Sequence, residues 1–173
     1  MIINRVWAMP NKWTFTIKPI AELLARYVGD GKGWIDPFTG EHSPAEFTND
    51  LNPNMPTQYH QKASEFLENL DGQVFNGVLF DPPYSLRQVK ECYESIGIKN
   101  LTQHETNYFP SDERRLAGRL IKNNGLSICC GWSSQGIGKM YGFHIIEILL
   151  VCHGRSHNDT IVTVEQKIQG NLK

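Results

Sequence analysis

Residues 78–84 read Val-Leu-Phe-Asp-Pro-Pro-Tyr, and the rest of the fold can be read outward from them. The three apolar residues predict a buried strand that ends at Asp81. The two prolines cannot continue a ladder of backbone hydrogen bonds, so the chain must leave the sheet in a rigid turn. The apolar periodicity that follows predicts a helix over 86–96, with Val89 and Cys92 among its inward-facing residues. A strand, a turn bearing a carboxylate and a helix in this order are typical of an α/β fold.

The same alternation continues on both sides of this segment. The patterns predict helices over residues 17–28, 63–70 and 111–123, and strands over 33–36, 46–50, 126–130, 144–151 and 160–167. A short turn joins the last two strands, which predicts an antiparallel β-hairpin at the end of a mostly parallel sheet. With no repeat or low-complexity linker in the sequence, we expect residues 1–173 to form a single domain, without a separate target-recognition domain.

Composition excludes several classes of protein. The 17 basic and 18 acidic residues give a net charge of -1, so the chain is not a strongly basic nucleic-acid coat protein. Contact with DNA or RNA would need a local patch. The apolar stretch 143–152 is too short for a membrane span and contains Glu147. Residues 1–5 lack the apolar core of a signal peptide, so we expect a cytoplasmic protein with no membrane partner.

The four cysteines form no C-x-x-C pair, and we expect them to be reduced. Cys129 and Cys130 lie in an apolar run that predicts a buried strand. Metal-ligand residue types also occur near the hairpin turn, at Cys152, His153, His157 and Asp159, yet they match no zinc spacing. We therefore predict no metal site.

Carboxylates follow three of the predicted strands, at Asp36, Asp50 and Asp81. Parallel sheets bind ligands beyond the carboxyl ends of their strands, and an acid after a second strand commonly binds ribose hydroxyls. The glycine-rich motifs that bind pyrophosphate are absent from the sequence. This combination favours a cofactor that has a ribose but no pyrophosphate.

The turn after the strand 78–80 has the chemistry to bind an amine. Pro83 has no amide hydrogen, so the Pro82 carbonyl is free to accept a hydrogen bond from a ligand. Asp81 supplies a second acceptor, which matches the two N–H groups of an exocyclic amine on a base. Tyr84 offers an aromatic face on which that base can stack.

Asp81-Pro82-Pro83-Tyr84 resembles the signature of the S-adenosylmethionine (SAM)-dependent amino-methyltransferases that modify adenine N6 in DNA. The resemblance implies a Rossmann-like SAM-dependent methyltransferase fold, with SAM as the cofactor and these four residues as the catalytic turn. It also implies a cofactor site that includes Phe15 and Lys18 in an N-terminal segment, Asp36, Phe38 and Gly40 in the first cofactor motif, and Asp50 at the ribose.

The resemblance implies methyl transfer to adenine N6 in DNA, where Tyr84 stacks on a base taken out of the helix. Two alternatives remain open: methylation of another planar amine, in RNA adenine or a protein amide, and a binding homologue without turnover that acts as an interaction subunit. The second is motivated by departures from the family pattern at Glu41, His42 and Lys62.

Recognition of the substrate must come from loops or from a partner. Arg115, Arg119 and Lys122 have helical spacing, which predicts that they share one face of the helix 111–123, and they are candidate contacts with nucleic acid if that face flanks the ligand site; otherwise the face is solvated. The loops 97–110 and 132–142 are candidate readers of base edges. A partner that supplies specificity, or a homo-oligomer, would fit a chain with so few residues for recognition.

Overall fold

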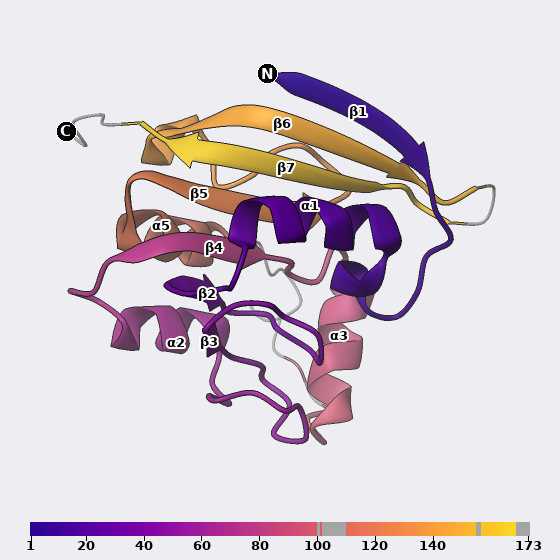
Figure 1. Cartoon of the computed structure of the whole chain (residues 1–173). Helices are drawn as coiled ribbons and strands as arrows, with labels where there is room; N and C mark the ends of the chain where they lie inside the picture. The colour runs from indigo at the N-terminus through magenta and orange to yellow at the C-terminus, as the bar shows by residue number, and fades with distance from the viewer. Residues whose placement is uncertain (100, 102–109, 155–156, 169–173) are drawn as a thin grey trace.

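The computed structural model describes residues 1–99, 101, 110–154 and 157–168. It contains one seven-stranded sheet with the order β1-β6-β7-β5-β4-β2-β3 (Figure 1). β7 is antiparallel to both β5 and β6, whereas the other neighbouring strands are parallel. This arrangement confirms the predicted α/β fold with a mostly parallel sheet and a C-terminal antiparallel hairpin.

The strands are β1 (Ile2–Trp7), β2 (Trp34–Asp36), β3 (Phe47–Thr48), β4 (Phe75–Phe80), β5 (Ile121–Gly131), β6 (Phe143–Cys152) and β7 (Thr160–Lys167). The helices are α1 (Lys18–Val28), α2 (Ala63–Asn69), α3 (Leu86–Ser95) and α5 (Ser111–Leu120), with short 3-10 turns η1 (Thr14–Thr16) and η2 (Lys139–Tyr141).

Helices cover the sheet from both faces and create two hydrophobic cores. On one face α1 buries Ile20, Leu23 and Leu24 against strand residues such as Leu79 and Val162. On the other face α2 and α5 pack on the opposite side of the same strands, and this second core contains Phe66, Leu67, Leu70, Phe75, Val78, Phe80, Leu116, Leu120 and Ile121. Figure 1 shows α1 on the near side of the sheet and α5 behind it. The central strands are thus buried on both faces, which holds their carboxyl ends in place.

α3 lies beyond the carboxyl end of β4 and stands apart from the two cores (Figure 1). Its first turn is capped by Ser85, whose hydroxyl accepts a hydrogen bond from the Gln88 amide at 3.3 Å. The helix buries Val89, as its periodicity predicts, but Cys92 is exposed, so the prediction that Cys92 points inward is wrong. Periodicity indicated an apolar face, but this helix covers the edge of the sheet instead of its surface.

β1 extends the sheet beyond the hairpin, and the sequence pattern did not predict it. Its partner β6 runs parallel to it, with Ile2 opposite Glu147. Glu147 is buried and accepts hydrogen bonds from Arg26 Nη2 at 2.8 Å and Tyr27 Oη at 2.6 Å, both on α1. Ile2 and Trp7 remain exposed. β1 is an edge strand without one buried face, so its sequence does not need the alternation of apolar and polar residues by which strands are predicted.

The boundary between α5 and β5 differs from the prediction. The helix ends at Leu120 and β5 begins at once with Ile121, which is buried and pairs with Phe75. The pairing then shifts to Leu126 opposite Gly77, which leaves residues 122–125 as a bulge. Lys122 is therefore on a strand, and the proposed helix face of Arg115, Arg119 and Lys122 does not form. Burial of Ile121 in the sheet outweighs the local preference for helix.

No helix in the described ranges is long and apolar enough to cross a membrane. Cys129 and Cys130 are buried in β5, as predicted, and all four cysteines are free thiols. His153 is buried, and its ring nitrogens lie 2.7 Å from the Ala8 carbonyl oxygen and 2.9 Å from Thr160 Oγ1. It therefore ties the loop after β1 to the hairpin.

Candidate functional site

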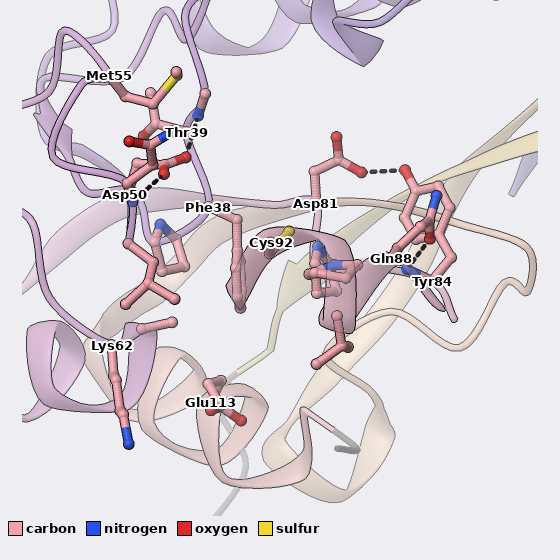
Figure 2. A pocket seen from close by; sticks show the side chains of 18 of the residues that line it. Phe38, Thr39, Asp50, Met55, Lys62, Asp81, Tyr84, Gln88, Cys92 and Glu113 are labelled. Carbon is pink, nitrogen blue, oxygen red and sulfur yellow. Dashed lines mark hydrogen bonds between the residues drawn. The ribbon is translucent and has the colours of Figure 1, made fainter. Parts of the chain in front are cut away.

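A cleft of about 1200 Å³ opens at the carboxyl ends of β2, β3 and β4 (Figure 2). Each of these strands is followed by a loop that enters the wall of the cleft: residues 37–40, 50–52 and 81–84. η1 and α3 complete the wall on either side. The cleft therefore lies where the sequence predicts a ligand site in a parallel sheet.

Asp36, the last residue of β2, holds the loop that follows the strand through hydrogen bonds. Asp36 is fully buried and does not line the cleft. Its Oδ1 accepts a hydrogen bond from the Phe38 amide at 3.0 Å, and its main-chain oxygen accepts one from Thr39 Oγ1 at 3.0 Å. Its second oxygen, Oδ2, makes no hydrogen bond of normal geometry with the described residues. In this structure Asp36 therefore acts on the loop, and Phe38 and Thr39 are the residues presented to the cleft.

Burial of this carboxyl has a consequence for stability. Burial raises the pKa of Asp36 from 3.8 to about 7, and the neighbouring Asp81 and Asp50 carboxylates add to the rise. The folded protein therefore binds a proton that the unfolded chain releases near pH 3.8. Stability from this group is fully present below pH 3.8 and is lost as the pH rises through about 7.

We expect the variant Asp36→Asn to lose this pH dependence. As the pH rises from about 5 to 7, the free energy of unfolding of the variant should increase relative to that of the wild type by about 1 kcal/mol per pH unit. The reason is that the wild type releases a proton from Asp36 on unfolding and so loses stability as the pH rises, whereas the variant has no such proton. Urea denaturation at several pH values measures it. Asp71→Asn, at a side chain that is 68% exposed, is the control. A difference between Asp36→Asn and wild type that stays constant with pH would contradict the expectation.

Asp50 joins two of the cleft loops. Its Oδ2 accepts a hydrogen bond from the Gly40 amide at 3.0 Å, and its Oδ1 accepts one from the Asn52 amide at 2.7 Å. Gly40 has φ 63°, and a Cβ there would lie 2.6 Å from the Trp13 ring, so only glycine fits this turn. Because each carboxylate oxygen carries two lone pairs, Asp50 can still accept two hydroxyl groups from a ligand.

Asn49 organises the same loops, and the sequence analysis did not single it out. It is fully buried, and its Nδ2 donates to the carbonyls of Pro37 at 3.1 Å and Gln61 at 3.0 Å. Its Oδ1 accepts a hydrogen bond from the main-chain amide of Gln61 at 3.0 Å. A side-chain amide can satisfy three backbone groups in this way, whereas an aspartate could not donate. The only signal in the sequence is its place beside Asp50 at a strand end.

The turn Asp81–Tyr84 forms the other wall of the cleft. Tyr84 Oη donates a hydrogen bond to Asp81 Oδ1, and the Tyr84 amide donates to Gln88 Oε1 at 2.6 Å (Figure 2). Burial raises the pKa of Asp81 to about 6, although hydrogen bonds from Tyr84 and Thr14 lower it. Thr14 belongs to η1, so the N-terminal segment reaches this turn. Asp81 is thus an ionised acceptor at neutral pH, with one oxygen already engaged by Tyr84.

The cleft has two distinct ends (Figure 2). Asp50, Thr39 and Met55 lie at one end, Asp81 and Tyr84 lie at the other, and Phe38 is between them. The cleft volume of about 1200 Å³ is slightly above the range of about 300–1000 Å³ that is usual for ligand sites.

Other residues from the sequence analysis divide between the cleft and the outer surface. Phe15 and Gly40 line the cleft, as do His42 and Lys62, two of the departures from the family pattern. Four basic residues lie on the outer surface: Lys18, Arg115, Arg119 and Lys122. The Lys18 side chain is 87% exposed and lies 4.0 Å from the carboxylate of Glu22. Arg115 lies 3.5 Å from the carboxylate of Asp112, and Arg119 lies 3.9 Å from that of Asp71. None of these four side chains lines the cleft. The loop residues 102–109 are outside the described residues.

Comparison with solved structures shows which known folds the chain is similar to. TrmN from Thermus thermophilus matches 88% of the chain with a TM-score of 0.55 and 16% identity, and a Streptococcus mutans protein provisionally described as a SAM-dependent methyltransferase matches 86% with a TM-score of 0.51 and 11% identity. The chain has the Rossmann-like fold of SAM-dependent methyltransferases. This agrees with the fold that the sequence resemblance implies.

The likeness to these methyltransferases concerns the fold and covers only part of each. The chain spans 49% of TrmN and 48% of the S. mutans protein. A Streptococcus thermophilus protein provisionally described as a hemolysin also matches, with a TM-score of 0.50 and 8% identity over 87% of the chain. No family model matches the sequence, and no curated protein matches it. Function on this methyltransferase fold must therefore be argued from the cleft itself.

Proposed function

We propose that the chain transfers a methyl group from SAM to the exocyclic N6 amine of adenine in DNA. The observation that carries the proposal is that Asp81 and the Asp50 carboxylate border opposite ends of one cleft on a methyltransferase fold. One end suits the ribose of a cofactor and the other suits an amine that donates hydrogen bonds.

The residues present fit the cofactor. Asp50 retains lone pairs for two ribose hydroxyls, and the turn at Gly40 lies directly beside it at 3.0 Å. Phe38 and Met55 supply apolar surface in the same part of the cleft. Bound SAM would supply an electrophilic methyl group on a sulfonium. The fold supports the same assignment.

The residues at the other end fit the acceptor. Asp81 and the Pro82 carbonyl can accept the two N–H bonds of the amine, which directs the nitrogen lone pair toward the methyl group. With SAM bound, the amine nitrogen would form a bond to the methyl carbon as the bond from that carbon to sulfur breaks, and the sulfur would keep the electron pair. The amine then loses one proton, for which the Asp81 carboxylate is the adjacent base. Tyr84 would stack on the adenine, which requires that its hydroxyl release Asp81.

A transfer assay tests the proposal. The purified chain would be incubated with SAM that carries a radiolabelled methyl group, together with DNA, RNA or protein, and labelled DNA would be digested to nucleosides. We expect label in N6-methyladenine from DNA. Label in RNA or protein alone would overturn the choice of acceptor. Absence of label from all three would overturn the enzymatic function and favour the binding homologue.

DNA is the proposed partner, and its recognition by the isolated chain should be weakly sequence-specific. We expect a broad set of methylated sites and a loss of DNA affinity of roughly tenfold or more between 50 and 200 mM salt, since phosphate contacts release counterions. Sequencing of methylated DNA and binding titrations at the two salt concentrations measure this. A single strict recognition sequence of four or more base pairs would contradict it, and would also remove the need for a partner or a homo-oligomer that supplies specificity.

A further inference from the structure

The loop that follows β5 is anchored from beneath by a buried carboxylate. Glu165 on β7 is 1% exposed, and its Oε2 accepts hydrogen bonds from Ser127 Oγ at 2.8 Å and the Ile137 amide at 2.6 Å. Its Oε1 accepts the Gly138 amide at 3.1 Å. Gly136 has φ 61°, and a Cβ there would meet Glu165 at 2.3 Å. A buried carboxylate with these three partners fixes the end of the loop on the sheet.

The part of this loop nearest the cleft presents an aromatic side chain to solvent. Trp132 is 45% exposed, and Ser133, Ser134 and Gln135 after it are exposed as well. The Trp132 ring lies 5.8 Å from the Tyr84 ring, at 60° to it. Trp132 does not line the cleft, so it stands just outside it, beside the residue assigned to the target base.

While Tyr84 is hydrogen-bonded to Asp81, the angle between the two rings shows that they do not form one flat stacking surface. At 60°, one planar base cannot lie flat on both rings. Stacking on aromatic side chains is the usual way in which proteins hold unpaired bases, and it tolerates any base because every base has a π-face. The two rings are in edge-to-face contact, so two neighbouring bases of one strand would have to stack on Tyr84 and Trp132 separately.

We propose that Trp132 stacks on the base next to the target adenine, and that the substrate is single-stranded DNA. The inference rests on the proposed function and deepens it. In a duplex the neighbouring base is stacked and paired, and it must leave that arrangement to reach Trp132. In a single strand the base is already free. Stacking on Trp132 therefore favours unpaired strands without reading a particular base.

Binding of short oligonucleotides tests the inference without any need for turnover. Fluorescence anisotropy with a labelled 12-nucleotide strand and the matching duplex would be measured on wild-type protein and on Trp132→Ala, Trp132→Phe and Trp7→Ala. Trp7 is the matched control, because it is 67% exposed on β1, four strands away from β4. Circular dichroism and thermal melting would verify that each variant is folded.

We expect Trp132→Ala to weaken single-strand binding by about tenfold, Trp132→Phe to retain most of it, and Trp7→Ala to leave it unchanged. In the methylation assay, KM for the strand should rise while kcat changes little. Wild-type affinity in Trp132→Ala, or the same loss in Trp7→Ala, would overturn the inference. Stronger binding of duplex than of single strand, or of RNA alone, would overturn it too.

Parallel assays separate this inference from the proposed function. Binding of the demethylated product of SAM and the rate of methyl transfer would both be measured on the same protein preparations. If the wild type methylates DNA and Trp132→Ala does so with unchanged KM, the inference fails and the proposed function stands. If no methyl transfer occurs but single-strand binding depends on Trp132, the stacking role stands and the proposed function fails.

Discussion

Asp81→Ala should lose methyl transfer by roughly a hundredfold to a thousandfold, the range seen when a group that stabilises developing charge is removed, while SAM binding remains close to that of the wild type. The variant loses the acceptor that orients the amine and the base that takes its proton, but Asp81 lies at the opposite end of the cleft from Asp50. Single-turnover rates and calorimetric titration with SAM measure the two quantities separately.

Two further variants define the role of this acid. Asp81→Asn should retain part of the activity, since its amide oxygen still accepts one hydrogen bond. Asp112→Ala is the control, because Asp112 is an acid that also borders the cleft but belongs to α5 and not to the turn. If Asp81→Ala lost SAM binding and turnover equally, Asp81 would belong to the cofactor end.

The pH profile gives a second readout. Burial raises the pKa of Asp81 to about 6, so activity should fall as the pH drops through about 6 and the carboxylate becomes protonated. Asp81→Asn should lack this acidic limb. An identical limb in the variant would assign it to another group.

Asp50→Ala should abolish most of the stabilisation that SAM and its demethylated product give to the fold. A ligand that binds only the folded protein adds about 2.7 kcal/mol at a hundredfold excess over its Kd. Loss of two charge-assisted hydrogen bonds to ribose should weaken affinity by tenfold or more. Thermal melting with and without the demethylated product measures the shift.

Asp50 also holds the Gly40 and Asn52 amides, so the unliganded variant should melt at a lower temperature than the wild type. The prediction concerns the additional shift on ligand addition, which separates binding from folding. Asp50→Asn, which keeps one acceptor oxygen, should be intermediate. An unchanged ligand-induced shift in Asp50→Ala would remove Asp50 from the cofactor site.

Much of the fold was predictable because it depends on local patterns. The strand before Asp81, the turn of two prolines and helix α1 with its buried Ile20 and Leu23 follow from burial periodicity and from residues that cannot continue a sheet. The end of α5 was not predictable in this way. Ile121 suits a helix or a strand equally by its neighbours, and only its pairing with Phe75 across the sheet decides.

The sequence was sufficient to predict which acidic residues border the site, but not which hydrogen bonds position the side chains there. Asp50 and Asp81 follow strands, and the fold brings both to one cleft. The role of Asn49 depends on three backbone groups from two loops, and the contact of Tyr84 with Asp81 depends on a rotamer. Lys18 matched a motif by spacing, yet its side chain is on the exposed side of α1. Spacing alone does not determine the direction of a side chain.

The pairing of β1 with β6 affects how the protein is made. Ile2 is synthesised 145 residues before its partner Glu147. At about 5–20 residues per second, β1 waits roughly 7–30 s before β6 is available to pair with it. During that time Ile2, Ile3 and Trp7 have no strand to pair with, and contacts so distant in sequence form slowly. Pairing at this edge therefore comes late relative to the synthesis of β1, and in the meantime β1 is available to a nascent-chain chaperone.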